Sequence, residues 1–330
     1  MLFLIQHETR LSYSEPVSET VFEVRMCPPS NEHQTNLGYR LKITPSAPVT
    51  INRDGFGNRV DLFNVLTQYR ELVIWASSIV RTHRPSVESR LNEIAWEPDR
   101  DDFRSLESCE YTLPSQLVRP CRELNEFLDG LRRPVDSVGS LIRRIVDAVR
   151  DRLTYEKKVT HARTPLREVL TLNRGVCQDF VHLFVGAARG LGLPARYVSG
   201  YVGEVGELAT HAWCQVHAGP IGWVDVDPTR GSFVDESYVT LAVGRDYADV
   251  PPNRGVWKGQ GDESIAVSVK VDSIDRVPTD WTYELGSQAP WSSASWVQSQ
   301  RSASRPRFMN SQAGYRQQQG QQQQSLIARG

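Results

Sequence analysis

The segment from Asn173 to His182 constrains the fold of this chain more than any other stretch. Gly175 frees the backbone, Cys177 follows two residues later, and an apolar run with helical spacing begins at once. The apolar positions are Phe180, Leu183, Phe184 and Ala187, which fall at i, i+3, i+4 and i+7 and therefore share one face of a helix. Two glycines and a proline within 190–194 should end it. The sequence thus predicts a helix that starts at or beside Cys177.

A cysteine at a helix N-terminus has two interpretations. The partial positive charge of the helix start favours a thiolate over a thiol, and the thiolate is the nucleophilic form. Free cysteine is also among the most buried residue types, so Cys177 could equally be a packing residue. This segment alone leaves both interpretations open.

Composition limits the class of protein. The chain has 330 residues with 39% hydrophobic and 23% charged residues, enough for two domains with buried cores. A formal net charge of −1 argues against general binding of nucleic acid or anionic membranes. The five cysteines lack regular spacing, which fits a reducing compartment better than a disulfide framework. The first residues lack the basic region and the long apolar region of a signal peptide, and no apolar run is long enough to span a membrane. We therefore expect a soluble cytoplasmic protein with no membrane partner.

The chain divides into four segments. Residues 1–85 alternate apolar and polar positions between turns, which predicts a β-sandwich-like N-terminal domain. Asp54 and Asn58 bracket a hairpin turn there and are interpreted as turn formers rather than metal ligands. Residues 86–134 form a helical or irregular connector, with short helices expected between Leu106 and Leu131. Residues 135–286 carry the chemistry, and residues 287–330, rich in Ser, Gln and Arg, should be a disordered tail.

Within 135–286 the pattern is α+β. An apolar stripe from Leu141 to Leu153 predicts one amphipathic helix, and Leu166 to Thr171 predicts a short second one. After the cysteine helix come strand candidates in close succession, namely Ala195–Val202, His211–His217, Gly222–Val226 and Ser264–Val271. A helix that opens onto antiparallel strands indicates an α+β domain rather than a doubly wound one.

A reactive thiolate needs a base and a group that orients the base. His211 starts one strand after a glycine-rich loop, and Asp227 ends the next, so the two lie at the open end of a predicted hairpin. Cross-strand neighbours have Cβ atoms roughly 5 Å apart, within reach of an imidazole–carboxylate hydrogen bond. Asp225 shares a face with Asp227 and is the rival for this position, but Asp227 lies nearer to His211.

A zinc site is the alternative use of the same strand, since His211, Cys214 and His217 are metal-ligand types at regular spacing. Alternation along a strand points Cys214 away from both histidines, and the histidines lie about 20 Å apart at roughly 3.3 Å per residue. We therefore expect no metal, and we interpret Cys214 as a packing residue. Asp179 is interpreted as a partner of the helix dipole and His182 as structural.

Three motifs in order are specific for a known family. Gly175-Val176-Cys177-Gln178-Asp179, His211-Ala212-Trp213 and Gly222 to Thr229 together resemble the bacterial transglutaminase-like family of the papain-like cysteine superfamily. The segments 13–17, 54–58 and 243–252 also look like that bacterial branch, so the resemblance covers about residues 1–285. It implies a papain-like/transglutaminase-like core, in which the cysteine-bearing helix packs on an antiparallel sheet. Cys214 departs from the family pattern and adds a second thiol near the site.

The resemblance implies Cys177 as nucleophile, His211 as general base and acid, and Asp227 as the orienting acid. The backbone N–H of Cys177 is a natural oxyanion donor, and Gln178 is the first candidate for a second one. These roles predict hydrolysis of a peptide or protein amide through a thioester acyl-enzyme. The alternatives are glutamine-to-amine acyl transfer, for which the glutamine-rich tail could serve as a substrate, and a binding module without catalysis. We expect no cofactor, since the sequence holds no acidic calcium loop; the oligomeric state stays open.

Overall fold

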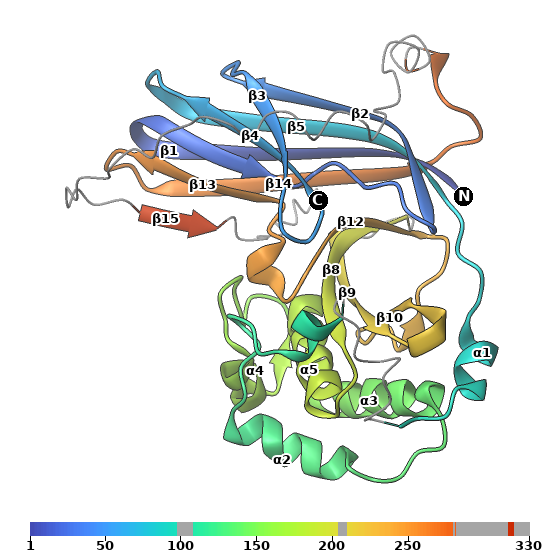
Figure 1. The fold of residues 1–330 in the computed structure, drawn as a ribbon. Coiled ribbons are helices and arrows are strands. Elements are labelled where there is room, and N and C mark those ends of the chain that lie inside the picture. The colour runs from blue at the N-terminus through green and yellow to red at the C-terminus, as the bar shows by residue number, and fades with distance from the viewer. Residues whose placement is uncertain (98–107, 204–209, 280, 282–315, 320–330) are drawn as a thin grey trace, which may run out of the picture.

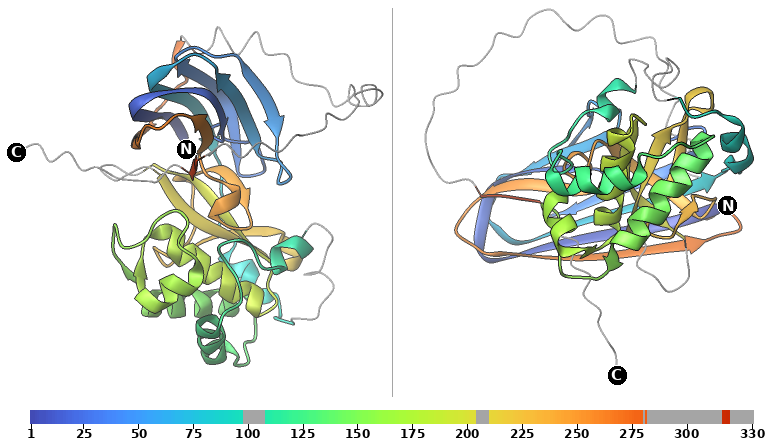
Figure 2. Two further views of the ribbon diagram at one scale, coloured as in Figure 1. Left: turned by 90° about the vertical axis from the view of Figure 1, so that its left-hand side faces the viewer. Right: turned by 90° about the horizontal axis from the view of Figure 1, so that it is seen from below.

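The computed structural model describes residues 1–97, 108–203, 210–279, 281 and 316–319. A curled antiparallel sheet lies on one side of the molecule, and a mixed core of helices and a second sheet lies on the other (Figures 1 and 2). The chain therefore has the α+β class that the sequence predicts.

The N-terminal sheet is organised around one long strand, β1 (Leu2–Val24). Its first half pairs with β5 and β14, and its second half pairs with β4 and β13 after irregularities near Val17 and Val21. The other strands are β2 (Gln34–Thr44), β3 (Val49–Arg53), β4 (Arg59–Val65), β5 (Tyr69–Thr82), β13 (Asn253–Lys258), β14 (Glu263–Ser273) and β15 (Arg316–Gln319).

This sheet curls because both halves of β1 bury apolar side chains toward the same interior. Leu11 from the first half and Phe22 from the second belong to one buried cluster with Phe63 of β4 and Leu72 of β5. Buried and half-buried positions alternate from Leu2 to Tyr13, and buried apolar residues return at Phe22 and Val24, so both halves of β1 contribute to that cluster. The outcome is the sandwich-like arrangement expected for the N-terminal segment.

One strand lies in a different sheet from the one its sequence position suggests. The sequence predicts Ser264–Val271 as part of the segment 135–286, but β14 pairs with β1 along its full length, from Phe3↔Ser273 to Tyr13↔Glu263. Its alternating face explains the placement, because Ile265 packs on the N-terminal cluster while Val269 and Val271 pack with Phe3 and Ile5. The N-terminal sheet therefore recruits three strands, β13, β14 and β15, from beyond the core.

The connector and the helices of the core follow the predicted order. They are α1 (Glu88–Glu93), a 3-10 helix (Cys109–Thr112), α2 (Arg122–Leu131), α3 (Val138–Arg152), α4 (Leu166–Leu172) and α5 (Cys177–Gly190), with a short parallel pair β6 (Thr154–Tyr155) and β7 (Arg174–Gly175) beside them. Helices α2, α3 and α4 lie on the side of the core away from the N-terminal sheet (Figure 2). Helix α5 is enclosed between these helices and the second sheet, which explains why almost all of its side chains are buried.

The second sheet has the order β11-β10-β9-β8-β12 and is antiparallel throughout. Its strands are β8 (Ala195–Val202), β9 (Thr210–His217), β10 (Trp223–Asp227), β11 (Ser232–Phe233) and β12 (Tyr238–Gly244), with 3-10 turns at Gly219–Ile221 and Tyr247–Asp249. Helix α5 packs on β9 and β8. The cysteine-bearing helix thus lies on the strand that carries His211, as predicted.

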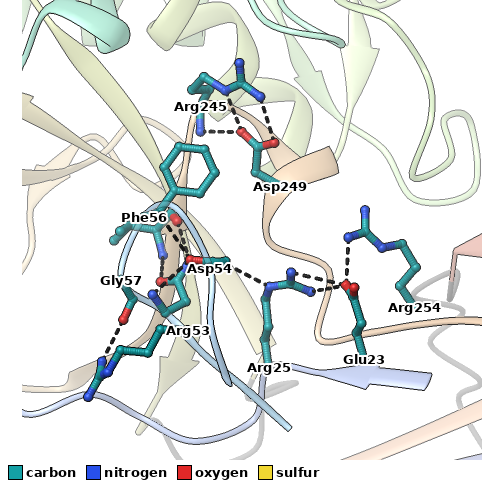
Figure 3. A network of polar contacts seen from close by, with 11 residues as sticks. Glu23, Arg25, Arg53, Asp54, Phe56, Gly57, Arg245, Asp249 and Arg254 are labelled. Carbon is teal, nitrogen blue, oxygen red and sulfur yellow. Dashed lines mark hydrogen bonds and ion pairs between the residues drawn. The ribbon is translucent and has the colours of Figure 1, made fainter. Parts of the chain in front are cut away.

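The 54–58 hairpin turn ties the two parts together. Asp54 accepts a hydrogen bond from Arg25 Nε at 3.1 Å, and Arg25 also contacts Glu23, which pairs with Arg254 of β13 (Figure 3). The ring of Phe56 in the same turn lies beneath the guanidinium of Arg245, at 5.6 Å, next to the Arg245–Asp249 pair. Asp54 and Asn58 are turn residues, as the sequence predicts, and the turn they make is an interdomain contact.

The tail predicted for 287–330 lies outside the described residues except for Arg316–Gln319, which pairs with β13. Within the described part of the chain, no helix has the length and apolar character needed to cross a membrane.

Candidate active site

Cys177 is the first residue of α5 and is partly exposed. Val176 precedes it in an extended conformation, and the side chain of Asp179 reaches back to accept the Val176 N–H at 2.8 Å. The Asp179 N–H in turn donates to the backbone carbonyl of Val176 at 2.8 Å, and these two bonds fix where the helix begins. Because Cys177 occupies the first helical position, its own N–H has no intrahelical acceptor and remains oriented along the helix start.

Asp179 is more than the dipole partner that the sequence predicts. The same oxygen, Oδ2, also accepts a hydrogen bond from Thr160 Oγ1 at 2.6 Å, and the residue is fully buried. Burial raises the pKa of Asp179 to about 6, although the hydrogen bonds from Thr160 and Val176 act in the opposite direction. A Cβ on Gly175 would come within 2.3 Å of this oxygen, so only glycine fits before the cysteine.

His211 lies between Cys177 and Asp227. Its Nε2 is 2.6 Å from Asp227 Oδ2, which leaves Nδ1 as the nitrogen that faces the cysteine. Burial alone would lower the pKa of His211, but hydrogen bonds with Asp227 and with the Cys177 sulfur, together with their charges, raise it to about 10. The structure therefore brings together the three residues that the sequence singles out, and it favours a protonated imidazole at neutral pH.

Asp227 is held by four donors although it is completely buried. Oδ2 accepts from His211 and from Tyr238 Oη at 2.8 Å, while Oδ1 accepts the backbone N–H groups of Thr229 at 2.9 Å and Arg230 at 3.1 Å. Burial would raise the pKa of Asp227, but these donors and the charge of His211 lower it below its ordinary value. These donors thus favour the ionised carboxylate although the side chain is not exposed to solvent.

Asp225, the rival of Asp227, is used elsewhere. Its Oδ1 accepts the indole N–H of Trp213 at 2.7 Å, and its Oδ2 pairs with the buried guanidinium of Arg84. Both oxygens of Asp225 therefore have partners other than His211: Trp213, and Arg84 from the segment that follows β5.

His211, Cys214 and His217, the candidate zinc ligands, each contact different partners in the structure. Cys214 is buried in the apolar core, with Sγ 3.1 Å from the carbonyl of Val226, and the ring of His217 packs edge-on against Trp223. His211 is committed to Asp227. In the described part of the chain, no set of three or more His, Cys, Asp or Glu side chains is placed to hold a metal ion.

Gln178 and His182 lie on the same helix. The side-chain amide of Gln178 points to the carbonyl of Ala162 at 3.5 Å, a long contact that turns it toward the loop before α4. Its role as a second oxyanion donor stays a prediction. His182 is buried, and its Nε2 accepts the Tyr247 N–H at 3.2 Å, which agrees with a structural role.

Two residues of the site, Thr160 and Tyr238, belong to none of the sequence motifs. Thr160 reaches Asp179 from a loop, and Tyr238 reaches Asp227 from β12, the far edge of the sheet. Tyr238 lies eleven residues beyond Asp227, separated from it by β11 and a turn. In the sheet order β9 and β8 separate β12 from β10, so only the three-dimensional structure shows that the Tyr238 hydroxyl reaches Asp227.

Comparison with known proteins identifies the family of this chain. Residues 125–228, which include Cys177, His211 and Asp227, match the model of the transglutaminase-like superfamily, and residues 3–81 match the bacterial transglutaminase-like N-terminal region. An uncharacterized protein of Mycobacterium tuberculosis is 32% identical over 293 residues, covering 82% of this chain and 92% of the relative. One of Mycobacterium leprae is 30% identical over 281 residues, covering 82% and 98%.

Among solved structures, a candidate cysteine protease from Cytophaga hutchinsonii superimposes with a TM-score of 0.66 at 21% identity, over 84% of this chain and 93% of that one. At 21% identity this similarity is evidence for a shared fold and not for a shared function. The two family models and the relatives at 30% identity or more, which this chain covers almost completely, lead to one conclusion: the chain is a member of the bacterial transglutaminase-like family, with the family's N-terminal region and its papain-like cysteine core.

Proposed function

We propose that this protein is a cysteine amide hydrolase acting on peptide or protein substrates, with Cys177 as nucleophile, His211 as general acid and base, and Asp227 as the orienting carboxylate. The observation that carries the proposal is the position of His211, which hydrogen-bonds with Asp227 at 2.6 Å and lies close enough to Cys177 for that residue to raise the pKa of the imidazole. An imidazolium beside a cysteine sulfur at a helix start favours the thiolate, the reactive form.

The first step forms the acyl-enzyme. The Cys177 thiolate attacks the carbonyl carbon of the amide, and the electron pair of the C=O bond moves onto oxygen. The backbone N–H of Cys177, and Gln178 if it turns from Ala162, would stabilise that oxyanion. As the C–N bond breaks, His211 donates its Nδ1 proton to the leaving amine, which leaves a thioester and a neutral imidazole.

The second step releases the acid. His211 accepts a proton from water, whose oxygen attacks the thioester carbonyl, and the thiolate departs as the C–S bond breaks. Asp227 holds the ring in one orientation throughout and stabilises the imidazolium at the start and the end of the cycle. Its burial and its four donors suit that task, because they keep a full negative charge fixed behind the ring.

Acyl transfer to an amine is the second candidate. It shares every step up to the thioester, and the match to a transglutaminase-like family model favours it. Ammonia release from a glutamine peptide that depends on an added primary amine would identify transfer, whereas amine-independent release would identify hydrolysis.

The experiment that tests the proposal measures iodoacetamide alkylation of each cysteine by mass spectrometry at pH 7. Cys121 is a matched internal control, because it caps the start of α2 and is also partly exposed, and burial raises its pKa. We expect Cys177 to react at least tenfold faster than Cys121 and to lose that advantage in His211→Ala. Equal rates at the two cysteines would contradict the proposed enzyme and would favour a binding module without catalysis.

Amide hydrolysis is tested in parallel with a library of fluorogenic peptide amides. Cys177→Ala should abolish turnover while its circular dichroism spectrum and Tm stay close to the parent's. Turnover that survives in this variant would refute the proposed nucleophile.

A further inference from the structure

Tyr238 is buried next to the Asp227–His211 pair but belongs to none of the motifs that identify the site. Its Oη lies 2.8 Å from Asp227 Oδ2, the same oxygen that contacts His211. Its ring packs edge-on against Trp213, with centroids 5.3 Å apart, and lies 6.1 Å from the His211 ring. Burial and the charge of Asp227 raise the pKa of Tyr238 well above its ordinary value, so the hydroxyl is a permanent donor.

We infer that Tyr238 is a positioning residue of the proposed reaction: its hydroxyl fixes the Asp227 oxygen that faces His211 and helps to keep that buried carboxylate ionised. The inference rests on the proposed function, because it assigns a role to a group that acts on the substrate only through Asp227 and His211.

The arrangement of donors around Asp227 supports this role. The two backbone N–H groups that bind Oδ1 come from one tight turn, Thr229 and Arg230, and fix only that side of the carboxylate. Oδ2 has His211 and Tyr238, and His211 must be free to exchange its proton during the reaction. Tyr238 is then the donor that holds Oδ2 in place while the imidazole changes its charge.

The strand that carries Tyr238 is itself fixed from the N-terminal domain. The side-chain amide of Gln34 on β2 bonds both backbone groups of Thr240, accepting its N–H at 2.7 Å and donating to its carbonyl at 2.9 Å. Asn58 does the same for Val243, at 2.9 Å and 2.7 Å. Both contacts are made along β12, the last strand of its sheet, so the N-terminal domain holds the strand from which the hydroxyl reaches Asp227.

Several other titratable or charged groups near Asp227 can influence the pH dependence of Cys177 alkylation. They are His211 on β9 with Cys177 of α5 beyond it, Cys214 on β9, Asp225 on β10, Arg230 after β10 with Nε 3.8 Å from Oδ2, and Asp235 near the Tyr238 hydroxyl. Removing the Tyr238 hydroxyl leaves all of these in place. The change it causes is therefore a change in the support of one carboxylate oxygen.

The test is the pH profile of Cys177 alkylation, from pH 4.5 to 9, in the full-length chain carrying Tyr238→Phe. Phenylalanine keeps the ring packing on Trp213, so the fold is expected to persist. We expect the rate at pH 7 to fall several-fold and the acid limb to move to higher pH, because Asp227 then protonates more easily. Tyr69→Phe is the matched control, since it removes another buried hydroxyl, bonded to Thr20 in the N-terminal sheet, and should leave the profile unchanged.

A double-mutant cycle with Asp227→Asn distinguishes an effect of Tyr238 through Asp227 from a nonspecific destabilisation of the site. If Tyr238 acts through Asp227, adding Tyr238→Phe to Asp227→Asn causes little further loss, whereas independent effects would multiply and overturn the inference. A Tyr238→Phe profile that superimposes on the parent's would also overturn it, provided that Cys177 of the parent is fast and depends on His211. A parent thiol as slow as Cys121 would instead refute the proposed function itself.

Discussion

His211 and Asp227 lie diagonally across two neighbouring strands, with Nε2 of the ring 2.6 Å from Oδ2 of the carboxylate. The register of β10 and β9 runs from Trp223↔His217 to Val226↔Cys214, so position 227 falls opposite 213, and His211 is two residues further along. Diagonal neighbours on one face are within reach of long side chains. A slip of one residue would turn Asp227 to the other face, so the register of this hairpin decides whether the pair forms.

Asp227→Asn should remove most of the reactivity of Cys177. Asparagine keeps the shape of the side chain but not the charge that stabilises the His211 imidazolium, so the pKa of His211 should fall. We expect alkylation of Cys177 at pH 7 to slow by about 100-fold or more. Asp225→Asn is the matched control, because its partners are Trp213 and Arg84. It should lower Tm and leave alkylation nearly unchanged, and the reverse outcome would identify Asp225 as the orienting acid.

Stability should fall between neutral and alkaline pH because of His211. Its pKa is raised to about 10 in the folded protein against about 6.5 in an unfolded chain. The folded state therefore binds this proton more tightly, so the contribution is complete below pH 6.5 and is lost as pH rises to about 10. Each unit of difference corresponds to about 1.4 kcal/mol. Urea unfolding at pH 6.5, 8 and 9.5 should show this slope for the parent and a flatter one for Asp227→Asn; parallel slopes would contradict it.

Gly175→Ala should damage the start of α5. The added Cβ would lie 2.3 Å from Asp179 Oδ2 and 2.7 Å from Asp179 Cβ, so the carboxylate must leave the Val176 N–H. We expect a loss of about 1–3 kcal/mol in the free energy of unfolding, together with slower alkylation of Cys177. Gly130→Ala in α2 is the same substitution in open space and should stabilise the protein by about 0.5–1 kcal/mol. Equal effects of the two substitutions would argue against the role of Asp179.

Gln34→Ala should weaken the attachment of β12 to the N-terminal domain. It leaves the N–H and the carbonyl of Thr240 without their partner in a buried contact, at a cost of about 1–3 kcal/mol. Differential scanning calorimetry should show a lower Tm, while Gln68→Ala, at an exposed turn position, should be within experimental error of the parent. An unchanged Tm in Gln34→Ala would show that this contact does not hold the strand.

Local patterns predicted the parts of the site that depend on neighbours in sequence. Helical spacing after Cys177 predicted α5, and alternation with a short turn predicted the hairpin of β9 and β10. Position along the hairpin also predicted that Asp227, rather than Asp225, lies next to His211, and the structure has that contact; the catalytic role of Asp227 stays a prediction. The interpretation of Asp179 as a dipole partner was incomplete, since its burial depends on Thr160 and Gly175 together.

The sequence by itself determined the elements that carry Cys177, His211 and Asp227, because periodicity and turn chemistry act over a few residues. Only the tertiary structure decided that β14 joins the N-terminal sheet, that Arg84 neutralises Asp225, and that Tyr238 supports Asp227. The partners in these contacts are between 11 and 270 residues apart along the chain. Each buried polar group needs a hydrogen-bond or ion-pair partner, and each apolar face needs another to pack against. The partner can come from any part of the chain, so local sequence patterns do not identify it.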